Sequence, residues 1–283
     1  MKIRSTVLAL GIAATLTGCQ NMDSNGLLSS GAEAFQAYSL SDAQVKTLSD
    51  QACKEMDAKA KIAPASSEYS QRLSKIATAL GDNINGQPVN YKVYETKDVN
   101  AFAMANGCIR VYSGLMDLMN DQELLFVIGH EMGHVVHDHT RRKVMMAYAT
   151  SAVKKGLASQ DNQVGLIAGS MIGAFAEQLV NAQFSQHEER QADRYGAAFL
   201  KAAGHDIGPA VSALEKLADL ARQHTFLSSH PNPDTRAKKL LTGDDAADDD
   251  ESWIDKTFSL IKHLVVGLFN IVIAMVNWLL SLL

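Results

Sequence analysis

Apolar residues recur at helical spacing in two stretches near the start of the main body of the chain. In "SLSDAQVKTLSDQACKEMDAKAKI" (39–62) and "SSEYSQRLSKIATALGDNI" (66–84), apolar side chains return every three or four positions. This spacing predicts amphipathic helices. Ser41 or Asp42 can cap the first helix, and Gly81 marks the end of the second. Two helices are therefore expected before any strand.

The pattern then changes to that of a small sheet. Polar and apolar residues alternate in "VNYKVYE" (89–95), and "CIRVYSG" (108–114) is rich in β-branched and aromatic residues. Helical spacing returns afterwards in four stretches: 121–148, 164–180, 185–203 and 206–223. The uncharged run that contains most of the second stretch, Asn162 to Ala176, is 15 residues long, which is short for a membrane span and predicts a buried helix. The fold class is therefore α+β and mainly helical, in one domain over residues 41–242.

The N-terminus has the features of an export signal. Two basic residues precede an uncharged run from Ser5 to Gly18, and Cys19 follows. Residues 1–18 are therefore expected to be a leader and not part of the fold. The ending "LTGC" resembles the bacterial lipobox, in which Cys19 becomes the lipidated first residue; an ordinary secretory signal is the alternative. Residues 19–40 would then tether the domain to a membrane.

Composition excludes one class of partner and suggests a disulfide. Without residues 1–18 the formal net charge changes from −5 to −7, because that segment has two basic residues and no acid. An acidic surface of this kind does not favour nucleic-acid binding. If Cys19 carries lipid, only Cys53 and Cys108 remain. Export to an oxidising compartment predicts that these two pair, and two separate buried thiols are the alternative.

The C-terminus carries an acidic linker (243–252) and a hydrophobic segment (253–283), expected to be a helix. Residues 264–283 contain no charge, and 20 helical residues span about 30 Å, the thickness of a bilayer core. One helical face is small or polar: His263, Gly267, Asn270, Ala274, Asn277 and Ser281. Membrane insertion, association with another helix and docking on the protein's own surface all remain open.

The stretch "VIGHEMGHVVHDHT" (127–140) carries the candidate chemistry. Positions four apart lie on one face of a helix, so His130 and His134 can bind one ion. Glu131 lies about 100° further round the helix, beside the ion. This is the HExxH arrangement, in which the two imidazoles bind Zn²⁺ and the glutamate accepts a proton from the attacking water.

His137 and His139 are local competitors for the metal. His137 falls near the face of the first two histidines, but its position one turn further along makes poor geometry for a shared ion. Both are expected to be exposed or to lie behind the ligands. The metzincin form of the motif needs a glycine at 137 and a histidine at 140, where this chain has His137 and Thr140. That class is excluded.

A third ligand has to come from another helix, and "FSQHEERQADRYGAAFL" (184–200) offers Glu189 and Asp193 four residues apart. A solvated helix face, with Arg190 and Arg194 as partners, is the alternative. The lipobox is followed in order by "NAFAMANGCIRVYSGLM", "HEMGH", "EERQAD" and "HPNPDTR". On these motifs the chain resembles the bacterial HtpX-like and CAAX-prenyl-endopeptidase-like zinc metallopeptidases, particularly their periplasmic lipoprotein branch. The resemblance covers roughly residues 1–242.

That resemblance implies a gluzincin-type metallopeptidase domain with a small β-sheet beside the HExxH helix. It makes Glu189 the third zinc ligand, with Asp193 supporting a ligand from behind. Glu188 is a rival, but it lies five residues before Asp193 where the family's pattern has four.

The resemblance also places His230 and Arg236 at the active-site cleft. A donor there would stabilise the oxyanion of the tetrahedral intermediate. For Arg236, an ion pair with Asp234 or another acid is the alternative.

Residues 100–107 are expected to form a strand at the rim of the cleft, along which an extended peptide can pair through its backbone. The rim residues are Asn100, Ala101, Phe102 and Ala103. A plain hairpin that packs on the active helix is the alternative.

Two functions of different classes follow. The first is a zinc endopeptidase that cleaves extended, unfolded or misassembled envelope proteins; it would be attached by lipid to the outer membrane and face the periplasm, since Gln20 follows the lipidated cysteine. The alternative is a proteolytically weak chaperone or assembly factor that uses the same cleft. A purely structural metal is a third reading. It would require four protein ligands, whereas two histidines and one glutamate leave a position open.

Overall fold

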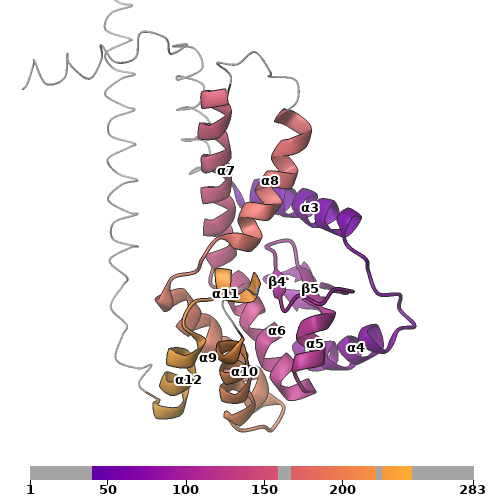
Figure 1. Cartoon of the computed structure of the whole chain (residues 1–283), viewed down its shortest axis with the longest axis vertical. Coiled ribbons are helices and arrows are strands. Elements are labelled where there is room, and N and C mark those ends of the chain that lie inside the picture. The colour runs from indigo at the N-terminus through magenta and orange to yellow at the C-terminus, as the bar shows by residue number, and fades with distance from the viewer. Residues whose placement is uncertain (1–39, 159–166, 221–224, 244–283) are drawn as a thin grey trace, which may run out of the picture.

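The computed structural model describes residues 40–158, 167–220 and 225–243 (Figure 1). The predicted leader, Cys19, the tether up to residue 39, the acidic linker from residue 244 and the hydrophobic C-terminal segment lie outside the described residues. Within the described part of the chain, no helix combines the length and apolar character that a membrane crossing requires.

Both helices predicted near the start of the domain are present. Helix α3 spans Asp42–Lys59 and α4 spans Glu68–Leu80. Ser41 caps α3: its hydroxyl accepts a hydrogen bond from the Gln44 backbone, while the Gln44 side chain accepts one from the Ser41 backbone. Helix α4 ends at Gly81, whose φ of 88° favours glycine.

Two small sheets follow, where the sequence predicted one. Strands β1 (Asn83–Ile84) and β2 (Gln87–Pro88) form an antiparallel pair. Strands β3 (Asn90–Tyr94), β4 (Ala101–Ala103) and β5 (Cys108–Tyr112) form a sheet of order β3-β5-β4. Strand β5 runs parallel to β3 and antiparallel to β4. Strand β4 therefore lies at an edge of its sheet.

The predicted disulfide between Cys53 and Cys108 is confirmed and joins α3 to β5. Beside it, Arg110 is almost fully buried and its Nε lies 2.7 Å from Asp57 Oδ1. The Tyr94 hydroxyl donates to the same oxygen at 2.7 Å. A covalent bond and a buried ion pair thus hold the sheet against α3.

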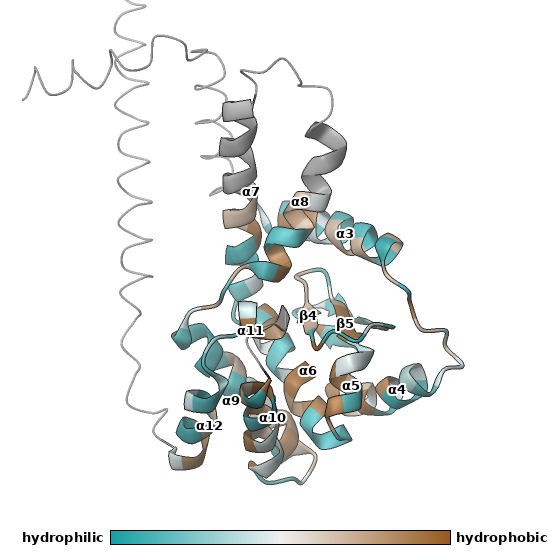
Figure 2. Cartoon of the chain, viewed as in Figure 1, coloured by the Kyte–Doolittle hydropathy of each residue, from teal (hydrophilic) through white to brown (hydrophobic). Residues whose placement is uncertain are grey.

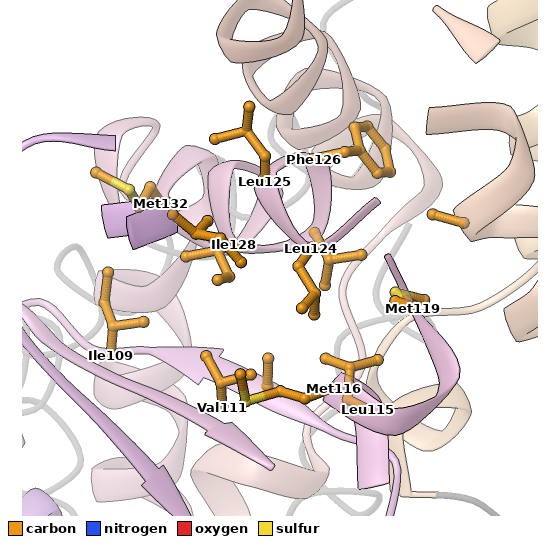
Figure 3. Packing of buried hydrophobic residues seen from close by; sticks show 14 of the residues in the cluster. Ile109, Val111, Leu115, Met116, Met119, Leu124, Leu125, Phe126, Ile128 and Met132 are labelled. Carbon is orange, nitrogen blue, oxygen red and sulfur yellow. The ribbon is translucent and has the colours of Figure 1, made fainter. Parts of the chain in front are cut away.

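The core lies between the three-stranded sheet and α6, which spans Asp121–Val136. Figure 3 shows Leu124 and Ile128 on α6 facing Val111 on β5 and Leu115 on α5 (Ser113–Leu118). These four side chains are fully buried, and burying each contributes roughly 1.5–3 kcal/mol. Helix α6 is covered on almost every side, which explains its continuous apolar run.

The helix predicted over residues 121–148 is interrupted, so this part of the prediction was wrong. Helix α6 ends at Val136, and α7 (His139–Ala158) begins after a turn in which Asp138 has a φ of 60°. Asp tolerates this left-handed conformation better than most residues. Helix α8 (Ile167–Asn181) packs beside α7 and α3 (Figure 1).

Four further described helices follow, of which the first two pack on α6, the third lies against α8, and the fourth packs on the second. They are α9 (Gln186–Ala202), α10 (Gly208–Asp219), α11 (Thr225–Ser229) and α12 (Pro233–Thr242). The last two were not predicted as helices, although Pro233 at the first position of α12 is a known start signal. Figure 2 shows that α6 is mainly hydrophobic, whereas α12 is largely hydrophilic. Helix α6 is therefore the central element of the domain.

Candidate metal centre

Helices α6 and α9 approach closely because glycines lie at their contact. A Cβ on Gly133 would lie 2.9 Å from the Ala192 Cα, and one on Gly196 would lie 2.7 Å from the Phe126 carbonyl oxygen. A side chain at either position would push the helices apart. The close approach brings Glu189, in the first turn of α9, against the middle of α6.

Four buried side chains place donor atoms around one point. The Nε2 atoms of His130 and His134 lie 3.0 Å apart. The carboxylate of Glu189 lies 3.6 Å from the first of these nitrogens and 3.5 Å from the second. His230 Nδ1 is 3.0 Å from Glu189 Oε1 and 3.2 Å from His130 Nε2. Two imidazoles from α6 and a carboxylate from α9 therefore converge, with a third imidazole from the segment after α11.

This donor set fits a divalent transition metal. Ligands of a tetrahedral zinc site, about 2.0–2.1 Å from the ion, are about 3.3–3.4 Å apart. The separations here range from 3.0 to 3.6 Å. Burial lowers the pKa of His134 and of His230, so both imidazoles are neutral at pH 7. Burial alone would raise the pKa of Glu189, but Arg236 and His230 outweigh it and keep the carboxylate ionised.

The Nδ1 atom of His130 is held by a carboxylate. It lies 2.9 Å from Asp193 Oδ1, and Arg236 Nε donates to the other oxygen of Asp193 at 2.8 Å. Burial would raise the pKa of Asp193, but Arg236 outweighs it and the pKa falls, so this acceptor is ionised. An ionised acceptor keeps the proton of His130 on Nδ1 and leaves Nε2 with a free lone pair for a metal.

His134 is oriented by another histidine and not by a carboxylate. Its Nδ1 lies 2.9 Å from His139 Nδ1, and His139 Nε2 lies 2.9 Å from the Gln191 amide oxygen. The amide oxygen can only accept, so His139 donates from Nε2 and accepts at Nδ1. His134 must then donate from Nδ1, which again leaves Nε2 bare. His139 is fully buried and lies behind His134, as one of the sequence alternatives predicted.

Glu131 lies beside the donor cluster and is not part of it. Its side chain is buried, and Oε1 lies 3.3 Å from His230 Nε2 without accepting a hydrogen bond from the described residues. Burial raises the pKa of Glu131 to about 7. The carboxylate is therefore poised to take up or release a proton near neutral pH.

The other candidates are also placed by the structure. Arg236 is buried and pairs with Glu189 and Asp193, which are the contacts of the ion-pair alternative. Glu188 is turned toward Arg142, at 2.9 Å, and is absent from the donor cluster. His137 forms the C-cap of α6 and likewise lies outside the cluster.

A small cavity of about 30 Å³ opens beside Glu131 and His230. The predicted rim residues Asn100, Ala101, Phe102 and Ala103 all line it, so the edge strand β4 runs along the site. The Phe184 ring also lines this cavity and stacks on His134, with ring centroids 3.5 Å apart.

Several residues of the site escaped the sequence analysis. Phe184 and Lys143 line the cavity, and Gln191 fixes His139. Gln191 lies within the EERQAD segment, and Phe184 lies four residues before it. A helical-wheel projection of this segment could have shown which positions face α6. Lys143 gave no signal, because a lysine four residues after His139 resembles any exposed position of a helix.

Comparison with known proteins decides the family. Residues 66–243 match the profile of Peptidase family M48, which is more than half of the chain. The chain belongs to peptidase family M48. The M48 match runs from just before α4 to the end of α12 and includes every donor of the cluster.

Other M48-like proteins align over most of the chain. It is 60% identical to Metalloprotease LoiP of Escherichia coli K12 over 242 residues, covering 85% of this chain and 96% of that protein. It is 45% identical to Metalloprotease YcaL of the same organism, covering 84% and 97%. Mitochondrial metalloendopeptidase OMA1 of Arabidopsis thaliana is 29% identical over 61% of this chain and 35% of that protein. With its M48 domain and metalloprotease relatives, the protein is a metalloendopeptidase with a divalent-metal site.

Proposed function

We propose that this protein is a zinc-dependent endopeptidase of the bacterial cell envelope that cleaves extended or misfolded proteins. The observation that carries the proposal is the convergence of His130, His134 and Glu189, with Glu131 next to them and outside the donor set. These three residues would hold the ion, and His230, the fourth member of the cluster, would act at the cleft and not as a ligand. Two histidines and a carboxylate with an open position are typical of catalytic zinc sites.

When bound, zinc polarises the scissile carbonyl and makes the attacking water more acidic. Glu131 accepts the proton of that water and later delivers it to the leaving amine. Its pKa, raised to about 7 by burial, suits a group that must do both near neutral pH. Its free Oε1 faces the cavity where the water and the peptide would meet.

His230 and Arg236 have separate roles in the proposal. His230 Nε2 lies 3.3 Å from Glu131 Oε1 and the residue lines the cavity, so it is placed to donate to the oxygen that becomes negative in the tetrahedral intermediate. Arg236 acts through the ligands: it keeps Glu189 and Asp193 ionised, and Asp193 orients His130.

The substrate would lie along strand β4. Strand β4 (Ala101–Ala103) is an edge of the sheet and, together with Asn100, lines the cavity beside Glu131. An extended peptide that pairs with this edge contributes mainly backbone hydrogen bonds, which are tolerant of sequence. Extended or unfolded chains fit this mode, because a folded domain rarely offers a free strand.

Features of the chain outside the site support the cellular setting. The leader, the lipobox at Cys19 and the disulfide between Cys53 and Cys108 all suit an exported protein. We therefore place the enzyme at the outer membrane, facing the periplasm, with unfolded or misassembled envelope proteins as substrates. Two similar proteins, from Yersinia pestis and Escherichia coli K12, are named beta-barrel assembly-enhancing proteases.

Casein cleavage by Glu131→Gln protein tests the proposal. The variant should retain one zinc per chain and lose nearly all cleavage, whereas Glu189→Ala should lose both zinc and cleavage. Undiminished turnover by purified Glu131→Gln would refute the role of Glu131. Complementation of a deletion strain separates the chaperone alternative, because Glu131→Gln would then restore growth as fully as wild type.

A further inference from the structure

Lys143 on α7 is buried beside the active site without an ion pair. Its side chain is 8% exposed, and Nζ lies 3.2 Å from the centroid of the Phe184 ring. Among the described residues, none forms a hydrogen bond or salt bridge with this ammonium group. A buried charge that is not paired is costly, so the position calls for an explanation other than stability. Burial lowers the pKa of Lys143 to about 8, which leaves the group mainly charged at neutral pH.

Thr140 provides a second unused donor at the same place. Its side chain is 5% exposed, and its hydroxyl has no hydrogen-bond partner among the described residues. Thr140 lies three residues before Lys143 on α7, so the two occupy one helical face. Both line the cavity that also contains Glu131 and His230.

Three acids attract Lys143, Glu131 most strongly, but none of them forms a hydrogen bond or salt bridge with it among the described residues. Glu189 contacts Arg236 and His230, and Glu188 pairs with Arg142. Lys143 therefore interacts with them over a distance and keeps its ammonium group available.

The charge balance indicates the kind of group that would complete the site. The buried charged side chains around the histidines are three carboxylates and two cations: Glu131, Glu189, Asp193, Arg236 and Lys143. Their formal sum is negative by one charge, and a divalent ion in the donor cluster would make it positive by one. An anionic group that entered the cavity would restore neutrality.

We propose that Lys143 and Thr140 form a subsite that binds a carboxylate of the peptide substrate close to the scissile bond. The cavity of about 30 Å³ has room for roughly two waters, which suits a group of carboxylate size. The carboxylate can be an aspartate or glutamate side chain or the free C-terminus of the substrate. The inference rests on the proposed function, since it assumes that peptides occupy this cleft.

Paired peptides test the subsite. The parent peptide is a casein segment that the wild-type enzyme cuts. If none is cut, the parent is a casein segment that binds Glu131→Gln protein. Each of three positions on either side of the bond is replaced by Asp, Asn, Glu and Gln in turn. A second set is shortened to end close to the bond, with a free or an amidated C-terminus. The kcat/KM ratio is measured with wild type, and the Kd ratio with Glu131→Gln by fluorescence anisotropy.

We expect one position, or one free C-terminus, at which the acid is preferred over its amide by about tenfold or more, as for a charge-assisted hydrogen bond. Lys143→Met, which keeps the apolar stem on Phe184, should reduce this ratio to within about twofold. Lys143→Arg should retain it, and Thr140→Val should reduce it in part. A preference in the substituted peptides identifies an aspartate or glutamate side chain as the bound carboxylate. A preference in the shortened peptides identifies the free C-terminus.

Lys238→Met on α12 is the matched control, because Lys238 is exposed to solvent; its ratio should equal that of wild type. Circular dichroism confirms that each variant is folded. The subsite is disproved if no acid is preferred in either set, or if the preference survives Lys143→Met. A preference seen in binding while wild type cuts nothing would instead count against the proposed function alone.

Discussion

Gly133 on α6 and Ala192 on α9 lie in close backbone contact between the two helices that carry His130, His134 and Glu189. A Cβ on Gly133 would lie 2.9 Å from the Ala192 Cα and 2.9 Å from the Tyr195 Cβ. Neither is the end of a flexible side chain, so α9 would have to move. Glu189 is on α9 and the two histidines are on α6, so this contact, together with the one at Gly196, sets the distance between the ligands.

Gly133→Ala should weaken metal binding. Overpacking costs about 1–3 kcal/mol, partly offset by about 1 kcal/mol of helix propensity gained on replacing glycine. The displaced carboxylate should reduce zinc affinity at least about tenfold, measured by chelator competition. Gly173→Ala is the control, since a Cβ there would meet only the flexible ends of Lys59 and Glu55. Equal zinc affinity in wild type and Gly133→Ala would contradict this account.

His139→Ala should lower metal affinity although His139 is not a ligand. Without it, His134 Nδ1 has no acceptor and its proton can move to Nε2, where it competes with the metal. Loss of such a partner typically costs about 10–100-fold in metal affinity or activity. His137→Ala is a matched control, because that residue lies outside the donor cluster. If His139→Ala and His137→Ala bind cobalt equally well in a chelator titration, the hydrogen bonds that link Gln191, His139 and His134 have no effect on metal binding by His134.

His230→Ala separates a catalytic site from a structural one. The Nδ1 atom of His230 lies among the donors, and its Nε2 faces Glu131. If His230 serves mainly as a donor at the cleft, the variant should keep zinc and lose about 10²–10³ in kcat. Zinc content and casein cleavage are measured on the same preparation. Loss of zinc together with activity would instead indicate a closed site of four protein ligands.

The acid limit of stability should depend on Asp57. Burial would raise its pKa, but hydrogen bonds from Arg110, Lys92 and Tyr94 outweigh this and hold the pKa well below the ordinary value. A lowered pKa stabilises the fold above the unfolded value of about 3.9, and this contribution is lost as pH falls below it. Asp57→Asn should destabilise the protein at pH 7 by about 3–5 kcal/mol, because Arg110 is left buried without its partner.

Urea unfolding at pH 7 and at pH 3 measures this effect. The difference between wild type and Asp57→Asn should shrink at pH 3, because the unfolded wild-type chain then binds a proton on Asp57 that the folded protein does not. Asp82→Asn, at an exposed position, should leave stability unchanged at both values. If the difference in unfolding free energy between wild type and Asp57→Asn is the same at pH 7 and pH 3, the charge of Asp57 is not what stabilises the sheet.

Local patterns in the sequence predicted the parts of the site that lie on one helix. The spacing of His130 and His134 and the position of Glu131 follow from helical geometry alone. The position of Glu189 does not, because it depends on how two helices pack, and the spacing of acids along α9 is also that of a solvated face. Only the family resemblance chose Glu189 over Glu188, and the structure shows the two side chains turned to different partners.

The parts that were missed are those fixed by tertiary contacts. The break between α6 and α7 depends on one left-handed residue, Asp138, in a polar stretch (137–143) that contains no glycine or proline to mark it. The parallel pairing of β3 with β5 joins two strands that are not consecutive in the chain, because β4 lies between them in sequence. Lys143 is buried by Phe184 from a different segment, so nothing in its own neighbourhood marks it as part of the cleft.

Anomalous diffraction at the zinc edge, from crystals of the wild-type protein grown with zinc, tests the central claim most directly. The account predicts a single strong peak about 2.0–2.2 Å from His130 Nε2, His134 Nε2 and a Glu189 oxygen, with Glu131 unligated beside it. A peak coordinated by Glu131, or no peak between these three side chains, would contradict it.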